Sequence, residues 1–179
     1  MLALDQVVVV PVGQAPHRTL DEDPGPEVRA RLCELAAGPD PRLAVSRIEL
    51  ERPDPSYTAD TLESMNAGEP DDELFLILGA DQAANLREWH EPERVLELAT
   101  VAVAEREGME RESVLRRLHG LPGADCIEFF AMPRLDVSSS LVRERVAAHR
   151  PIRYLVPDAV ADCIEAELLY LSPSPAPAR

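Results

Sequence analysis

Short apolar runs rich in β-branched residues alternate along this chain with longer amphipathic stretches, and this alternation constrains the fold more than any other feature. Strands are expected at residues 7–12 (VVVVPV), 43–50 (LAVSRIEL), 74–79 (LFLILG), 100–104 (TVAVA) and 127–131 (IEFFA). Several of these runs are almost continuously apolar, as parallel strands covered on both faces are. The sequence therefore predicts an α/β fold, a Rossmann-like doubly wound domain with a mostly parallel sheet.

Amphipathic stretches between and after these strands predict the helices. They lie at residues 26–37, 59–66, 92–98, 111–118, 138–148 and 157–167. The length of 179 residues suits one globular domain with a real core. We expect that domain to span residues 1–171. The tail at residues 172–179 (SPSPAPAR) is expected to be disordered, because it has no large apolar side chains to bury in a core.

The charge balance excludes two classes of partner. Eighteen basic residues against 33 acidic ones give a net charge of −15, whereas general binding to nucleic acid or to an anionic membrane requires a basic surface. Aromatic residues make up only 4% of the chain, which argues against base-stacking platforms for single strands. Every basic residue is Arg, so any charged side chain that holds a phosphate here has to be Arg or His.

Cysteine and histidine usage points to a cytoplasmic protein without a structural metal site. The three cysteines are far apart in the sequence, and none forms a C-x-x-C pair. The four histidines show no ligand spacing for a metal. No signal peptide opens the chain, and no apolar run approaches the ~20 residues that span a bilayer.

The segments that follow the expected strands form the candidate site, because ligands of such sheets bind at the carboxyl ends of the strands. In chain order these segments are GQAPHR, ERPDPSYT, GADQAANLREWH, EREG and MPRLDVSSSLVR. Arg, His, Gly, Ser, Thr and Trp recur in them. The last segment places Ser138, Ser139 and Ser140 at a helix start with Arg143 one turn further on, a dense cluster of anion donors. The alternative for this cluster is an over-provided N-cap with a surface arginine.

Taken together, the chain resembles the bacterial nicotinate-nucleotide adenylyltransferases of the HxGH nucleotidyltransferase superfamily. The resemblance covers roughly residues 4–170 and rests on VVVVPVGQAPHR, VSRIELERPDPSYTADTLE, LFLILGADQAANLREWHEPERVLELA, VAVAEREG, LDVSSSLVRERV and IRYLVPDAVADCIEAELLY, in the family's order. It implies transfer of AMP from ATP to nicotinate mononucleotide, giving deamido-NAD and pyrophosphate. It also implies Mg²⁺ with ATP and a direct in-line attack without a covalent intermediate, chemistry that depends on positioning and charge neutralisation.

The resemblance also assigns residues to the two substrates. ATP would be bound by His17, Arg18, Gly79, Asp81, Arg106, Ser138, Ser139, Ser140 and Arg143. Nicotinate mononucleotide would be bound by Thr58, by Trp89 stacked on the pyridine ring, and by the backbone near His90. Structural alternatives stay open at several positions: an exposed turn for His17 and Arg18, an ordinary helix cap for Thr58, a core role for Trp89, and a solvated surface for Arg106.

The chain departs from the family where the superfamily's catalytic histidines should stand. No GxFDPxHxGH segment is present, and the only His-Gly pair, His119-Gly120, follows Arg117 instead of a histidine. We therefore assign no catalytic residue, and we expect that a central βα unit of about twenty-odd residues is missing. Its loss would expose the edges of two strands, so the chain as written should be poorly stable and nearly inactive. In the family's Arg-Pro-Gly turn, Glu107 replaces the proline.

Two alternative functions remain open at this stage. One is nucleotidyl transfer to another phosphorylated acceptor, such as phosphopantetheine, against which SYTADTLE and REWH argue. The other is a degenerate nucleotide-binding module without catalysis. A cysteine or serine hydrolase is disfavoured because no nucleophile turn is recognisable. A misassigned start codon, a truncation and true degeneration all stay open as explanations for the missing segment. Assembly into a homo-oligomer is a separate open question.

Overall fold

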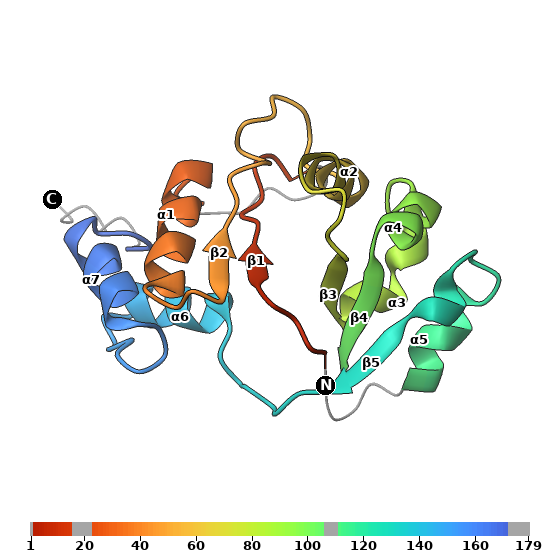
Figure 1. Ribbon diagram of the computed structural model, residues 1–179. Helices are drawn as coiled ribbons and strands as arrows, with labels where there is room; N and C mark the ends of the chain where they lie inside the picture. Colours follow the sequence, from red (N-terminus) through yellow and green to blue (C-terminus); the bar gives the residue numbers. More distant parts are fainter. Residues whose placement is uncertain (1, 16–22, 106–110, 172–179) are drawn as a thin grey trace, which may run out of the picture. The chain divides into compact units, whose positions relative to one another are not determined.

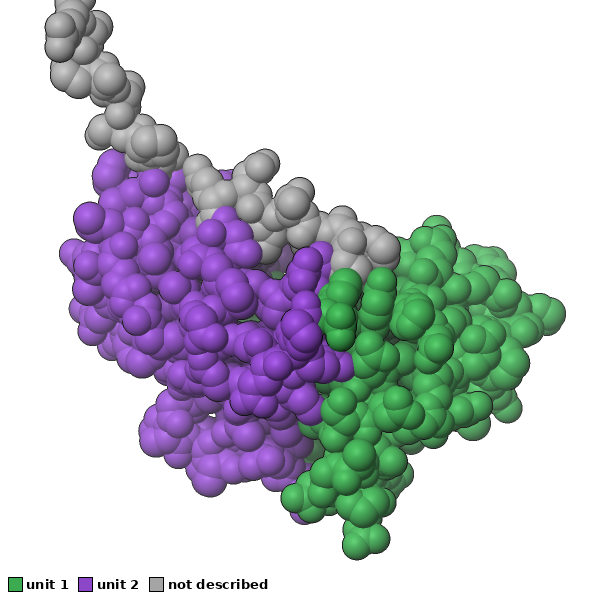
Figure 2. All heavy atoms as spheres, turned by 90° about the horizontal axis from the view of Figure 1, so that it is seen from above, with its two compact units in different colours: residues 1–4, 54–135 green, residues 5–53, 136–179 purple. Residues whose placement is uncertain are grey.

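The computed structural model describes residues 2–15, 23–105 and 111–171, and its α/β class with parallel strands confirms the expected fold class (Figure 1). The chain forms two compact units. Unit 1 consists of Met1–Leu4 and Asp54–Leu135, and unit 2 of Asp5–Pro53 and Asp136–Arg179 (Figure 2). Each unit has its own parallel sheet and its own apolar core, and each is described here by itself.

The sheet of unit 1 has three parallel strands in the order β3-β4-β5. The strands are β3 (Phe75–Gly79), β4 (Thr100–Glu105) and β5 (Glu128–Ala131). The middle strand β4 is buried on both faces, because Val101 and Val103 point to one side while Ala102 and Ala104 occupy the other. Continuous burial of this kind is what the apolar run predicted.

Helices of unit 1 cover this sheet. They are α2 (Thr58–Gly68), α3 (Ala80–Ala84), α4 (Pro92–Leu98) and α5 (Arg111–Leu118), with short 3₁₀ turns η1 (Leu86–Glu88) and η2 (Ala124–Cys126). α3 packs against α5, β3 and β4, and α4 packs against β4 and α2. The helices at 92–98 and 111–118 were predicted with these bounds, whereas α3 was not predicted because five residues give too short a period to recognise.

The core of unit 1 is a cluster of fully buried aliphatic side chains. Its largest members come from η1, α4, β4 and α5: Leu86, Val95, Val101, Val103, Val114 and Leu118. Gly123 lies at the edge of this cluster with φ +82°, and a Cβ atom there would lie 3.1 Å from the Cβ of Leu96. Glycine is therefore required at position 123 both by the left-handed backbone and by the close approach of α4.

Unit 2 contains a two-stranded parallel sheet and three helices. The elements are β1 (Val7–Val9), α1 (Pro26–Ala37), β2 (Leu43–Val45), α6 (Ser139–Ala147) and α7 (Asp158–Ala166). α1 packs on β2 and on α7, and Arg31 of α1 forms an ion pair with Glu167 just after α7. The buried cluster consists of Val142, Ile152, Val160 and Ile164.

Both strands of unit 2 are shorter than the sequence predicted. The expected strand at 43–50 was wrong beyond Val45, because the chain turns there: the N–H groups of Leu50 and Glu51 donate to the carbonyl of Arg47 at 2.8 and 3.2 Å. The expected strand at 7–12 ends at Val9. Apolar residues occur after the last residue of β1 and of β2, but they are not part of a strand pair. An apolar run in the sequence does not show where its partner strand ends.

Both outer edges of each sheet are without a partner strand among the described residues. β1 pairs only with β2, and β3 pairs only with β4. Ile77 of β3 is 43% exposed and Val9 of β1 is 38% exposed, whereas parallel strands of an α/β fold are usually covered on both faces. The missing βα unit stays a prediction. In the part of the chain that the structure describes, no helix has the length and apolar character needed to cross a membrane.

The burial contrast within α5 gives a direct test of the core of unit 1. Leu118 is fully buried, whereas Leu115 on the same helix is 36% exposed. Replacing Leu118 by Ala should lower the free energy of unfolding by about 2–5 kcal/mol, because it removes buried methyl groups and leaves a cavity. Leu115→Ala is the matched control and should cost well under about 1 kcal/mol. Urea denaturation of both variants measures the difference, and equal losses would contradict this assignment of the core.

The start of α6 supports a second stability prediction. The Oγ atom of Ser138 accepts a hydrogen bond from the N–H of Leu141 at 3.1 Å, so Ser138 is the N-cap. Ser138→Ala should destabilise the protein by about 0.5–2 kcal/mol, because a first-turn N–H loses its acceptor. Ser139→Ala removes a neighbouring exposed hydroxyl at the first helical position and should cost only a few tenths. A urea midpoint for Ser139→Ala as low as that for Ser138→Ala would show that the cap does not matter.

Candidate functional site

The predicted site residues fall into one group in each unit. Unit 1 holds Thr58, Gly79, Asp81, Trp89 and His90. Unit 2 holds Ser138, Ser139, Ser140 and Arg143. His17, Arg18 and Arg106 lie outside the described residues.

The start of α2 presents backbone N–H groups, with Thr58 as the first helical residue. Tyr57, not Thr58, occupies the N-cap position, and it makes no side-chain capping bond. The carbonyl of Tyr57 accepts two bonds from Thr61, one from its N–H at 3.2 Å and one from its Oγ1 at 3.1 Å. The alternative reading of Thr58 as an ordinary cap is therefore wrong. First-turn N–H groups of a helix lack intrahelical acceptors and favour an anion.

Trp89 and His90 lie on the turn between η1 and α4. The N–H of Trp89 donates to the carbonyl of Leu86 at 3.1 Å, and Pro92 then starts α4. Between them Glu91 has a left-handed backbone with φ 49°, an unfavourable conformation for a residue other than Gly or Asn. Trp89 is half-buried and packs against the core of unit 1, so a core role holds for one part of its ring while the rest stays accessible.

A ring contact joins these two segments. The rings of Tyr57 and His90 lie with their centroids 4.2 Å apart and their planes tilted by 32°. A second link runs between the same two helices, where Arg94 of α4 pairs with Glu63 of α2 at 2.7 Å. The structure therefore brings together the PSYT and REWH segments that the sequence predicted to share a ligand. Sequence reasoning named His90 but missed Tyr57, since no local pattern indicates which distant ring it meets.

The carboxyl end of β3 leads into Gly79 and Asp81. Gly79 has ordinary extended angles, φ −74° and ψ 154°, and a Cβ built there would meet no atom within 4 Å. Neither the backbone conformation nor the packing of this chain requires glycine at position 79, so any requirement for it comes from a ligand. Asp81 lies exposed in the first turn of α3.

The start of α6 exposes three hydroxyl groups and one guanidinium. Ser138, Ser139 and Ser140 are all exposed, and Nη2 of Arg143 donates to Oγ of Ser140 at 3.4 Å. The N-cap alternative is correct for Ser138, but a hydroxyl that accepts a bond still has a proton to donate. Among the described residues, ion pairs hold Arg29, Arg31, Arg42, Arg47 and Arg94. Within the described part of the chain, the hydrogen bond found for Arg143 is to a neutral hydroxyl, and none of these ion pairs involves it.

Arg29 adds a second cation to this end of unit 2, and sequence reasoning did not identify it. Its Nη2 donates to the carbonyl of Gly13 at 3.3 Å, at the start of the GQAPHR segment, and its Nε lies 3.1 Å from Asp23. Burial raises the pKa of the Tyr170 phenol, while the nearby charges of Arg143 and Arg29 lower it. The charges of both guanidinium groups therefore act on Tyr170.

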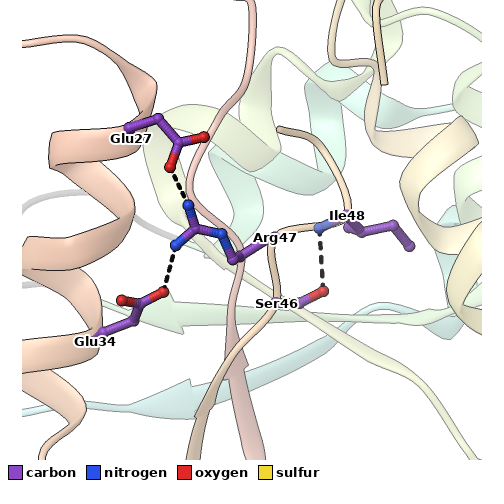
Figure 3. A network of polar contacts seen from close by, with 5 residues as sticks. All are labelled: Glu27, Glu34, Ser46, Arg47 and Ile48. Carbon is purple, nitrogen blue, oxygen red and sulfur yellow. Dashed lines mark hydrogen bonds and ion pairs between the residues drawn. The ribbon is translucent and has the colours of Figure 1, made fainter. Parts of the chain in front are cut away.

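A network of polar contacts holds the segment after β2 against α1 (Figure 3). Nη1 of Arg47 donates to Glu34 at 2.7 Å, and Nη2 contacts Glu27, which lies seven residues earlier on the same helix. The N–H of Ile48 donates to Oγ of Ser46 at 3.4 Å. Hydrogen bonding to Glu34 raises the pKa of Arg47, and the charge of Glu27 adds to this effect. The role of this arginine is structural, because both of its terminal nitrogens already have carboxylate partners.

Two hollows on the described surface are lined by residues other than the predicted site residues. One in unit 2 is lined by Glu27, Val28, Arg31, Glu34 and Arg47. One in unit 1 includes Leu74, Thr100 and Cys126, so it lies at the amino ends of β3 and β4, opposite the edge where such sheets bind ligands. Within residues 2–15, 23–105 and 111–171, no group of three or more His, Cys, Asp or Glu side chains is arranged to hold a metal ion.

Comparisons with a family model and with curated proteins point to one family. Residues 1–145 match the family described as cytidylyltransferase-like. A probable nicotinate-nucleotide adenylyltransferase of Roseiflexus sp. (strain RS-1) is 40% identical over 171 residues, which cover 94% of this chain and 84% of that protein. A protein of the same name from Mycobacterium avium (strain 104) is 39% identical over 179 residues, covering 98% and 84%.

Solved structures agree on the fold. Nicotinic acid mononucleotide adenylyltransferase of Plasmodium falciparum complexed with NaAD superposes with a TM-score of 0.69 at 19% identity, covering 93% of this chain and 82% of that one. The same enzyme complexed with APC gives a TM-score of 0.67 at 18% identity. On the family match and the level of identity to its curated relatives, the chain belongs to the nicotinate-nucleotide adenylyltransferases of the cytidylyltransferase-like family.

Proposed function

We propose that this protein transfers the AMP moiety of ATP to nicotinate mononucleotide, which yields deamido-NAD and pyrophosphate, in the biosynthesis of NAD. The observation that carries the proposal is the 40% identity to a probable nicotinate-nucleotide adenylyltransferase over 94% of the chain. The reaction class is nucleotidyl transfer. Both substrates are phosphorylated anions, whereas the protein has a net charge of −15, so binding depends on local donors and not on the overall field.

Nicotinate mononucleotide is proposed to bind in unit 1. The half-buried ring of Trp89 offers a face for the pyridine, and the first-turn N–H groups at Thr58 offer donors for its carboxylate. The backbone near His90 completes the site, because the ring contact with Tyr57 holds that segment beside the start of α2. An uncharged amide in place of the carboxylate would gain less from these donors.

ATP is proposed to bind through the donors at the start of α6. Ser138, Ser139 and Ser140 supply hydroxyl protons, and Arg143 brings a positive charge to the β/γ end of the triphosphate. His17, Arg18, Gly79, Asp81 and Arg106 are the further proposed ATP contacts. Hydrogen bonds to charged groups are worth roughly 1.5–3 kcal/mol each, more than the ~0.3–1 kcal/mol of a helix N-terminus, so the side chains of the α6 start dominate.

Mg²⁺ is proposed to arrive with ATP as part of the substrate, since the phosphates themselves are its preferred oxygen ligands. The attacking group is the phosphate of the mononucleotide, which needs no activation by a nucleophilic side chain of the protein. The residues of this chain orient the two phosphates in line and neutralise charge. We place the reaction in the cytoplasm, in keeping with the free cysteines Cys33, Cys126 and Cys163.

The acceptor site can be tested directly, because Trp89 is the only tryptophan of the chain. Nicotinate mononucleotide stacked on Trp89 should change its fluorescence, and nicotinamide mononucleotide should bind about tenfold or more weakly, because it forfeits charged hydrogen bonds. Titration of both ligands against the 179-residue protein measures the ratio. Equal affinities would count against a carboxylate site beside Thr58 and Trp89.

Catalysis is expected to need a segment that these 179 residues do not contain. The sequence has no His-x-Gly-His pattern, and in the superfamily these histidines stabilise charge on the transferring phosphate. The 179-residue protein should therefore show little ATP-dependent synthesis of deamido-NAD, on the order of 10²-fold or more below a form with such a segment encoded upstream. Pyrophosphate release, with both substrates present, measures it. Substantial synthesis by the 179-residue protein would refute this expectation.

One observation keeps a second function in view. The same absence of the His-x-Gly-His pattern is what a nucleotide-binding module without catalysis would show. In-frame translation of the genomic DNA upstream of Met1 separates the two. A G-x-F-D-P-x-H-x-G-H sequence there supports the enzyme, whereas a stop codon supports the binding module.

A further inference from the structure

We propose that Tyr57 and His90 act together as a positioning pair that sets the affinity for the acceptor substrate. This inference rests on the proposed function, since it concerns the site for nicotinate mononucleotide. It assigns a role to the side chain of His90 and to Tyr57. The pair acts by holding two ligand-binding segments at a fixed separation.

The contact itself is well placed for this role. Tyr57 is the N-cap residue of α2, and its carbonyl is fixed by two hydrogen bonds from the buried Thr61, at 3.2 and 3.1 Å. Its ring meets the imidazole of His90 at a centroid distance of 4.2 Å. The anchored end of the pair is therefore the helix start, and the imidazole is held against it.

The pair joins the two segments directly beside the proposed ligand groups. Thr58 follows Tyr57 in the chain, and Trp89 precedes His90. Holding Tyr57 against His90 therefore fixes the first-turn N–H groups of α2 relative to the ring of Trp89. A planar aromatic acid needs both at once, with donors in the plane of its carboxylate and a stacking partner on its ring face.

α2 and α4 also pack against each other, and Leu62 and Val95 share the apolar core of unit 1, so the ring contact acts on the segments just before these helices. The turn that carries His90 passes through Glu91 at φ 49°, a conformation that persists only when its surroundings enforce it. The second link between α2 and α4 is the pair Arg94–Glu63, whose side chains are 40% and 62% exposed. Exposed ion pairs contribute little to holding two elements together.

The experiment measures binding and not turnover, so it uses the 179-residue protein. Nicotinate mononucleotide is titrated while Trp89 fluorescence is recorded, for the wild type and for Tyr57→Ala and His90→Ala. Each alanine variant should raise Kd about tenfold, because the ring contact is lost. Tyr57→Phe and His90→Phe preserve a ring at each position and should stay within about twofold of the wild type.

The double variant distinguishes a pair from two independent residues. If Tyr57 and His90 act through each other, replacing both by Ala should raise Kd about tenfold and not about a hundredfold. Glu63→Ala is the matched control, because it breaks the other link between the same two helices. It should leave Kd within about twofold of the wild type, since that pair is exposed.

Each outcome bears on a different claim. Wild-type fluorescence that does not respond to nicotinate mononucleotide would overturn the proposed function, and this inference with it. A wild type that binds, with alanine variants that bind equally well, would overturn only the positioning role. Phe variants as weak as the Ala variants would also overturn it. Circular dichroism checks folding, and if Tyr57→Ala unfolds, His90→Ala decides, because His90 is exposed.

Discussion

Burial of β4 on both faces is the interaction on which unit 1 depends. Val101 and Val103 face one covering layer, and Ala102 and Ala104 face the other, so the strand is fixed in both directions normal to the sheet. Hydrogen bonding to β3 and β5 then sets its register, which pairs Gly79 at the end of β3 with Ala104. Because parallel strands share one direction, the segments that leave β3 and β4 emerge at the same edge of the sheet. The position of a ligand site in this unit is therefore a consequence of the packing of one apolar strand.

Much of this arrangement could be predicted from the sequence because it depends on local pattern. The helices at 26–37, 92–98 and 111–118 begin and end where amphipathic periodicity begins and ends. The strand expected at 43–50 failed after Val45 because strand length depends on a partner, and no partner residue is visible in a single sequence. The five-residue α3 escaped prediction because it completes little more than one turn.

The candidate site also has a part that local sequence pattern predicts and a part that it does not. Thr58, Trp89 and Ser138 were identified from segments whose residue types match a family in order and spacing, and the ligand roles assigned to them stay predictions. Tyr57 was missed although it is adjacent to Thr58, because its role lies in a contact with a ring far along the chain. Arg29 was missed for a similar reason: its bond to the carbonyl of Gly13 joins α1 to the segment after β1. Long-range contacts of this kind are set by the fold, so a pattern search along one chain does not find them.

The distribution of arginine shows how an acidic protein can bind a polyanion. Among the described residues, ion pairs hold Arg29, Arg31, Arg42, Arg47 and Arg94, and Arg47 is held by two carboxylates. An arginine compensated in this way offers little to a phosphate, since its Coulomb attraction is offset by its own partners. Arg143 differs because its contact is with the hydroxyl of Ser140, which is neutral. A phosphate at this helix start would meet a charge that needs no prior separation from a carboxylate, and this is the physical reason for proposing Arg143 as a ligand of ATP.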